Sequence, residues 1–136
     1  AQAIGAEGVH LGQTDLHVND ARRILGPHAI IGLSIENRNQ LLEANEWDVD
    51  YVAMSPVFAT PTKPDAAQPW GILGLKEARG LSHHPLIAIG GIHSANASTV
   101  IEAGADGIAV VSAICSAPSP EKAAFELKKI IEGSRR

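Results

Sequence analysis

The sequence predicts an α/β fold built on a parallel β-sheet, and three observations point to it. Five short apolar runs recur along the chain, and most are continuous rather than alternating, which is typical of strands covered on both faces. A segment with apolar residues at helical spacing follows each run. The runs lie about 20 residues apart, with a longer interval of about 35 residues after the third. A strand followed by a helix, repeated five times, indicates right-handed βαβ units.

Each element is justified by its own residues. The apolar runs predict strands over 8–12, 29–34, 50–58, 85–91 and 107–114. Helical spacing predicts helices over 19–26, 37–44, 71–80, 94–106 and 119–133. Gly26 and Gly104 are suited to end their helices, and Ser94 is the expected N-cap of the fourth. Ser119 followed by Pro120 predicts the cap and first residue of the last helix.

Two architectures use this repeat, the open doubly wound sheet and the closed eight-stranded barrel. No G-x-G-x-x-G motif follows the first strand, which counts against a dinucleotide-binding fold. Five units are too few to close an eight-stranded barrel, which needs about 200 to 250 residues. The chain is therefore expected to be a single domain over 1–136, the truncated C-terminal part of a (β/α)₈ TIM barrel that supplies about five βα units.

Composition excludes several classes of protein. The chain has 11 basic and 15 acidic residues, a net charge of −4, and no basic cluster before its C-terminus, so nucleic acid is not an expected partner. No apolar stretch reaches the roughly 18 residues of a membrane span, and the first residues do not resemble a signal peptide. Cys115 is the single cysteine, so an internal disulfide is excluded, and it is expected to be a small buried thiol. A cytoplasmic location is expected.

Candidate site residues gather where the predicted strands end, because parallel α/β proteins place their working groups just beyond the carboxyl ends of strands. They are Gln13, Asp15, Ser34, Thr60, Thr62, Lys63, Gly90, Gly91, Val111 and Ser112. Hydroxyls, backbone amides and one cation suit anionic oxygens, and a carboxylate suits a hard metal ion.

Each of these residues also has a simpler structural explanation. Gly90 and Gly91 fit a phosphate-binding loop, but they equally fit a tight strand-to-helix turn. Asp15 fits a Mg²⁺ ligand or a helix-capping acid. Lys63, between two prolines that stiffen the loop, fits a positioned cation or a solvated surface lysine. Ser34 could simply bond to neighbouring backbone. The histidines show no metal-ligand spacing.

The order of motifs along nearly the whole chain resembles the thiamine-phosphate synthase family, (β/α)₈ barrels of thiamine biosynthesis. The matching segments are "GVHLGQTDL", "IIGLS", "DYVAMSPVFATPTKPDA", "PLIAIGGI" and "AGADGIAVVSAI". The T-x-T-K-P-D stretch is the most specific of them, whereas the glycine-rich segments also occur in other phosphate-binding barrels.

The resemblance implies a Mg²⁺-dependent reaction that joins a hydroxymethylpyrimidine diphosphate to a thiazole phosphate and releases pyrophosphate. By position, Asp15 would bind Mg²⁺, Ser34 would contact the pyrimidine, and Lys63 would hold the leaving diphosphate as the catalytic residue. The thiazole phosphate would be bound by Thr60, Thr62, Gly91, Val111 and Ser112.

The chain departs from the family pattern in two respects. The family's first three strands are not in this sequence, and with them a Q-x-R-x-K diphosphate clamp and an N-D-D metal motif, so the fragment alone is expected to be inactive. The family also often has Ser-x-His after the strand that ends at Ser34, where this chain has Glu36, whose role is left open.

Two other functions remain to be distinguished. A thiazole tautomerase would need a histidine near Glu36 and would tolerate loss of T-x-T-K, the reverse of this sequence. A non-catalytic phosphate-binding barrel fragment would keep the anion site without the chemistry. Open sheet edges in such a fragment also predict association into homo-oligomers.

Overall fold

The computed structural model describes residues 1–60 and 68–134. Five parallel strands form one sheet in the sequential order β1-β2-β3-β4-β5. They are β1 (Gly8–Leu11), β2 (Ile30–Ile35), β3 (Tyr51–Met54), β4 (Leu86–Ile89) and β5 (Gly107–Ala109). A doubly wound sheet reverses its strand order at a switch point, whereas a (β/α)₈ barrel does not. The observed order therefore confirms the barrel architecture, of which this chain supplies five units.

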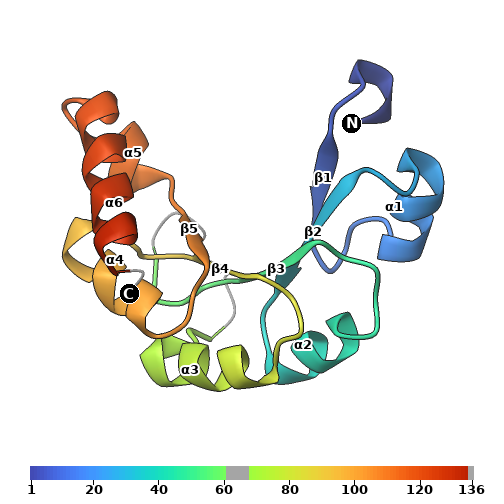
Figure 1. The fold of residues 1–136 in the computed structure, drawn as a ribbon, viewed down its shortest axis with the longest axis horizontal. Helices are drawn as coiled ribbons and strands as arrows, with labels where there is room; N and C mark the ends of the chain where they lie inside the picture. The colour runs from blue at the N-terminus through green and yellow to red at the C-terminus, as the bar shows by residue number, and fades with distance from the viewer. Residues whose placement is uncertain (61–67, 135–136) are drawn as a thin grey trace.

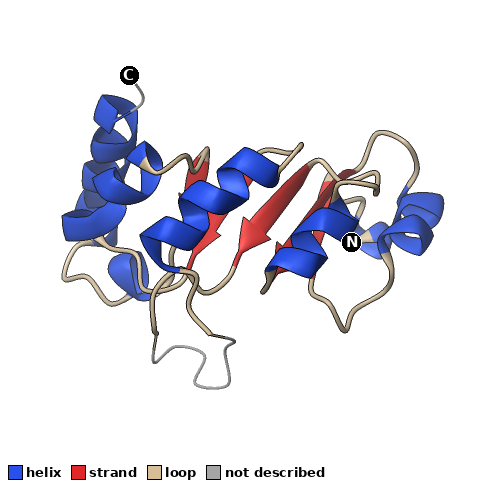
Figure 2. Ribbon diagram, turned by 90° about the horizontal axis from the view of Figure 1, so that it is seen from below, coloured by secondary structure: helices blue, strands red, loops and turns tan. Residues whose placement is uncertain are grey.

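The helices lie along the outside of the curved sheet. They are α1 (Val18–Leu25), α2 (Arg38–Ala44), α3 (Gly71–Leu81), α4 (Ser94–Glu102), α5 (Ser112–Cys115) and α6 (Pro120–Ser134), preceded by the short 3₁₀ helix η1 (Gln2–Ile4). The strands follow an arc, with α1, α2, α3 and α4 on its convex side (Figure 1). Seen from below, helices lie in front of the strands (Figure 2). In the described part of the chain, no helix is long and apolar enough to cross a membrane.

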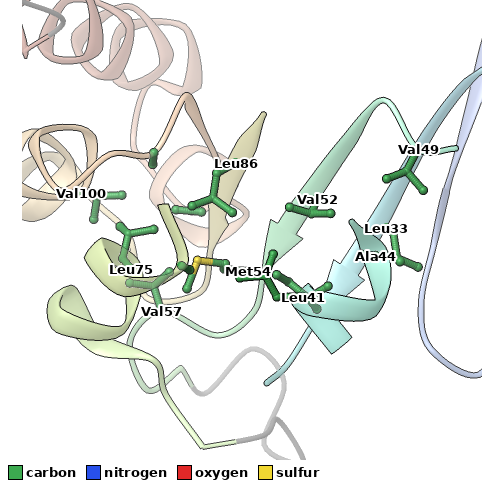
Figure 3. Packing of buried hydrophobic residues seen from close by; sticks show 14 of the residues in the cluster. Leu33, Leu41, Ala44, Val49, Val52, Met54, Val57, Leu75, Leu86 and Val100 are labelled. Atoms are coloured by element: carbon green, nitrogen blue, oxygen red, sulfur yellow. The ribbon is translucent and has the colours of Figure 1, made fainter. Parts of the chain in front are cut away.

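The hydrophobic core fills the space between the convex face of the sheet and the helices (Figure 3). Strand side chains alternate between faces, so every second residue points into this layer. Its fully buried side chains include Val52, Met54 and Leu86 from the strands, together with Leu41 and Leu75 from α2 and α3. Burying each such side chain contributes about 1.5–3 kcal/mol. The other face of each strand is left to line the concave side of the arc.

Two arginine–aspartate pairs tie the N-terminal ends of the strands together. Just before β3, Asp50 Oδ2 accepts from the backbone N–H of Ile31 in β2 (2.7 Å) and from the guanidinium of Arg22 in α1 (3.1 Å). The arrangement is repeated two units later. There, Asp106 Oδ2 accepts from the N–H of Leu86 (2.7 Å) and from Arg79 of α3 (2.9 Å). Each carboxylate thus joins the start of one strand to the preceding strand and to the helix that comes before that preceding strand.

The structure corrects the predicted extent of two strands. The third strand ends at Met54 rather than near residue 58, and the fifth ends at Ala109 rather than near residue 114. Val111 and Ser112, expected within the last strand, are instead the N-cap and first residue of α5. A short apolar run does not distinguish a buried strand from a short helix, which explains the error.

Two predictions for single residues were also wrong. His93, not Ser94, is the N-cap of α4, because Asn96 and His93 form a capping box across the first turn. Cys115 is exposed rather than buried, since the short helix α5 turns it away from the core.

Candidate functional site

A cavity of about 210 Å³ lies at the carboxyl ends of β3, β4 and β5. It is lined by residues of the strand ends and of the loops that follow them: Ser55, Thr60, Ile89, Gly90, Gly91, Ile92, Ala109, Val110, Val111 and Ser112. Four residues predicted from the sequence to share a phosphate, Thr60, Gly91, Val111 and Ser112, are therefore brought together in one cavity. We call this the β3–β5 cavity.

Gly90 and Gly91 form one wall of the cavity and have no room for a side chain. Their φ angles are +99° and +65°, which L-residues rarely adopt. A Cβ on Gly91 would lie 2.8 Å from Cβ of Phe58 and 2.9 Å from the carbonyl oxygen of Ala59. Phe58 also donates its N–H to the carbonyl of Gly90 (3.1 Å). The glycines therefore make a tight turn and also let two loops approach closely, so both interpretations of this pair apply.

The start of α5 forms the facing part of the cavity. Val111 and Ser112 open this helix, and the amides of a first helical turn have no acceptor within the helix. The hydroxyls of Ser55 and Thr60 line the same cavity. Backbone N–H groups and hydroxyls converging on one small space suit the oxygens of a phosphate group. Ser55 was not predicted from the sequence, because the third strand was expected to continue to residue 58 and therefore to contain Ser55, whereas it ends at Met54.

Asp15 and Ser34 lie on the β1–β2 side of the site and do not line the β3–β5 cavity. Gln13 links the loop after β1 to the end of β2, because its side-chain amide donates to the carbonyl of Ser34 (2.6 Å). Asp15 Oδ2 accepts from the backbone N–H of Gly12 (2.7 Å), which fixes the carboxylate just beyond β1. Glu36 follows β2 directly, and its N–H donates to Gln40 Oε1 (2.7 Å).

A divalent cation at this edge of the sheet would depend on Asp15. Residues 1–60 and 68–134 contain no cluster of three or more His, Cys, Asp or Glu side chains able to hold a metal ion. Mg²⁺ is commonly bound through one or two carboxylates together with substrate phosphates. Among the described residues, Oδ2 of Asp15 accepts from backbone and Oδ1 has no hydrogen bond, so this carboxylate is suited to be such a ligand.

Thr62 and Lys63, two of the predicted site residues, lie outside the described residues. Thr60, immediately before that segment, lines the β3–β5 cavity. The roles of Thr62 and Lys63 remain predictions.

A hydrogen-bonded group on the concave face was missed by the sequence analysis. His10 on β1 bonds through Nδ1 to the hydroxyl of Tyr51 (2.9 Å) and through Nε2 to Oγ of Ser34 (2.8 Å). Burial lowers the pKa of His10, partly offset by the Asp15 carboxylate, and burial raises the pKa of Tyr51. His10 keeps contact with solvent. The sequence offered no signal for this group, because the row that joins His10, Gly32 and Tyr51 across three strands depends on strand register, which apolar patterning does not give.

Comparison with known proteins agrees with this geometry. Residues 1–114 match a family model described as thiamine monophosphate synthase. Two curated relatives are both described as thiamine-phosphate synthase. The one from Albidiferax ferrireducens is 52% identical over 132 residues, covering 97% of this chain and 60% of the relative. The one from Vibrio parahaemolyticus is 46% identical, covering 97% and 65%.

A solved structure shows the same fold. The thiamine phosphate pyrophosphorylase of Pyrococcus furiosus superimposes with a TM-score of 0.89 and 38% identity, over 98% of this chain and 63% of that one. The chain thus spans less than two thirds of the length of these relatives.

Proposed function

The chain belongs to the thiamine monophosphate synthase family, and on that premise we propose that it forms the substrate-binding part of a thiamine-phosphate synthase. The reaction joins a hydroxymethylpyrimidine diphosphate to a thiazole phosphate. The C–O bond between the pyrimidine methylene and the diphosphate breaks, pyrophosphate leaves with the electron pair, and the thiazole nitrogen supplies the pair that forms the new C–N bond. The observation that carries the proposal is the meeting of Thr60, Gly91, Val111 and Ser112 in the β3–β5 cavity.

The β3–β5 cavity is proposed to bind the thiazole phosphate. Its volume of about 210 Å³ suits a phosphate group with part of a small ring. The glycine loop and the start of α5 bring backbone amides to the phosphate oxygens, while Thr60 and Thr62 add hydroxyl donors. Holding the thiazole by its phosphate orients the ring nitrogen toward the reacting carbon and lowers the entropy cost of the bimolecular step.

The pyrimidine diphosphate is proposed to lie toward the β1–β2 side, where Ser34 contacts the ring and Lys63 binds the leaving diphosphate. Membership of the family implies that the bond to the diphosphate breaks first and leaves a pyrimidine carbocation, so the main demand is stabilisation of the departing anion rather than proton transfer. Mg²⁺, bound through Asp15, would neutralise part of the diphosphate charge. The proposed partners are two small molecules, and the proposed location is the cytoplasm.

The test is an assay of the complete barrel, in which the remaining strands of the family accompany this chain, for thiamine phosphate and pyrophosphate with both substrates and Mg²⁺ present. Lys63→Ala is expected to lower the rate by about 10²–10³, the typical effect of losing one preorganised donor to a developing charge. Lys76→Ala, which removes a lysine from the exposed face of α3, is the matched control and should leave turnover unchanged. Equal turnover by the wild type and Lys63→Ala would make Lys63 an ordinary solvated lysine.

Assayed without any further segment, the 136 residues are expected to give no turnover. The proposed site within these residues has one carboxylate for Mg²⁺, Asp15, and one basic side chain for the diphosphate, Lys63. These two groups are too few to neutralise the leaving diphosphate. Turnover near that of the relatives would contradict this expectation.

A further inference from the structure

Three side chains on the concave face form a continuous hydrogen-bonded chain that crosses three strands. Tyr51 on β3 reaches over β2 to His10 on β1, and His10 reaches back to Ser34 on β2. Gly32 makes this possible, because a Cβ there would overlap the Tyr51 ring and would lie 2.6 Å from His10 Nδ1. The Tyr51 and His10 rings are stacked, with centroids 5.5 Å apart and an interplanar angle of 27°.

The direction of the hydrogens in this chain decides what Ser34 can do. A neutral imidazole has one N–H and one acceptor nitrogen, so only two arrangements satisfy both bonds. In the first, the Tyr51 hydroxyl donates to Nδ1 and Nε2–H donates to Ser34 Oγ. In the second, the Ser34 hydroxyl donates to Nε2 and Nδ1–H donates to Tyr51. Only the first leaves the Ser34 hydrogen available for another acceptor.

The chemistry of the two hydroxyls favours the first arrangement. A phenol, with a pKa of about 10, is far more acidic than an aliphatic alcohol, so it is the better donor to an imidazole nitrogen. Ser34 Oγ bonds to His10 Nε2 and to no other partner among the described residues. In the first arrangement its O–H therefore points to an acceptor outside this part of the chain.

We infer that His10 and Tyr51 are positioning residues that hold His10 as the Nε2–H tautomer and so make Ser34 a hydrogen-bond donor to the substrate. This deepens the proposed function and rests on it for the identity of the substrate, the pyrimidine diphosphate. Neither His10 nor Tyr51 needs to touch that substrate. Tyr51 fixes the tautomer. The imidazole Nε2–H then donates to one of the two lone pairs of Ser34 Oγ, which leaves the Ser34 hydrogen for the substrate.

Nitrogen-15 NMR of the purified protein tests the tautomer without any substrate. The His10 signals are identified among those of the six histidines by their loss in His10→Gln. Nε2 is expected to be protonated and Nδ1 unprotonated, and Tyr51→Phe is expected to mix the two tautomers. The exposed His83, changed to Gln, is the control and should leave the His10 signals in place. A protonated Nδ1 in the wild type would overturn the inference.

A double-mutant cycle, measured on the complete barrel that contains this chain, tests whether Tyr51 acts through Ser34. Tyr51→Phe should raise the KM for the pyrimidine diphosphate by roughly 2- to 12-fold, the equivalent of one neutral hydrogen bond, and leave the KM for thiazole phosphate unchanged. In a Ser34→Ala background the same change should have no further effect. His10→Gln, which keeps an amide donor for Ser34, should retain more affinity than His10→Ala.

Two outcomes separate this inference from the proposed function. An equal effect of Tyr51→Phe with and without Ser34 would show a role other than positioning Ser34, and would overturn the inference while turnover persists. If the complete barrel that contains this chain makes no thiamine phosphate, the proposed function is wrong, and the tautomer seen by NMR still decides whether Ser34 is a free donor.

Discussion

At the scale of single residues, both the fold and the proposed site require that Gly91 has no Cβ atom. Gly91→Ala places a Cβ against Phe58 and the Ala59 carbonyl at a φ of +65°. We expect a loss of about 1–3 kcal/mol in unfolding free energy and a raised KM for thiazole phosphate. Gly80→Ala in α3, where a Cβ meets nothing within 4 Å, should instead stabilise by about 0.5–1 kcal/mol. Urea unfolding of both variants measures the contrast, and a destabilised Gly80→Ala with an unaffected Gly91→Ala would contradict it.

Asp50 gives a prediction for the pH dependence of stability. Its pKa is lowered chiefly by the hydrogen bond from the Ile31 N–H and further by Arg22, with burial opposing. Because the folded pKa lies below the unfolded one, the stabilisation is complete above the unfolded value and is lost as the pH falls through the folded value. The side chain is 46% exposed, so solvent screening limits the effect to about 1 kcal/mol. The stability difference between wild type and Asp50→Asn should be constant from pH 7 to about 5 and shrink in stronger acid. A difference that grows on acidification would contradict this.

Some site residues could be predicted from the sequence, because their position along the chain is enough to place them at one edge of the sheet. Gly91 and Thr60 follow strands directly, so the rule for parallel sheets places them at the correct edge. The bond between His10 and Tyr51 joins residues 41 apart and depends on strand register and on the space above Gly32. Neither register nor that space can be obtained from apolar patterning alone.

At the scale of elements, Arg22 holds the end of α1 against the starts of β2 and β3. Its side chain is 14% exposed, and it donates to the carbonyl oxygens of Ala29 and Asp48 and to the carboxylate of Asp50. A lysine has no planar fork to serve several acceptors, so Arg22→Lys should cost about 1–3 kcal/mol of unfolding free energy.

Arg38 provides the matched control for this change. It pairs with Glu77 at 3.1 Å, but both side chains are more than half exposed, and Arg38→Lys should change stability by less than about 0.5 kcal/mol. Equal effects of the two substitutions in thermal or urea unfolding would show that the hydrogen bonds of Arg22 to Asp50 and its neighbours add nothing to the unfolding free energy.

The five strands could be predicted from their apolar runs and the five main helices from their helical spacing, whereas α5 could not be predicted. The run that contains β5 continues through Val110 and Val111, so composition gives no boundary at Ala109. The chain turns there because Val111 leaves the extended conformation, with φ −111° and ψ −76°, and starts a single helical turn. That turn supplies the Ser112 end of the β3–β5 cavity, so the least predictable element is one of those that form the proposed site.

At the scale of the whole molecule, the sheet has two edge strands, β1 and β5, in the described part of the chain. Ile30, 51% exposed on the concave face, and Leu16, 50% exposed, add apolar surface near the β1 edge. Open edges and apolar surface favour association, so the 136 residues by themselves should sediment as dimers or larger species. Ile30→Ser should weaken that association more than Leu73→Ser on α3. A stable monomer at high concentration would contradict the prediction.

The central claim is that the loops after β4 and β5 bind a phosphate group through their backbone amides. Titration of the purified protein with thiazole phosphate, followed by amide chemical shifts, tests it most directly. We predict saturable shifts largest at Gly91 and Ser112, greatly reduced when the thiazole alcohol without its phosphate is used. Shifts confined to other parts of the chain, or equal shifts with the alcohol, would contradict the account.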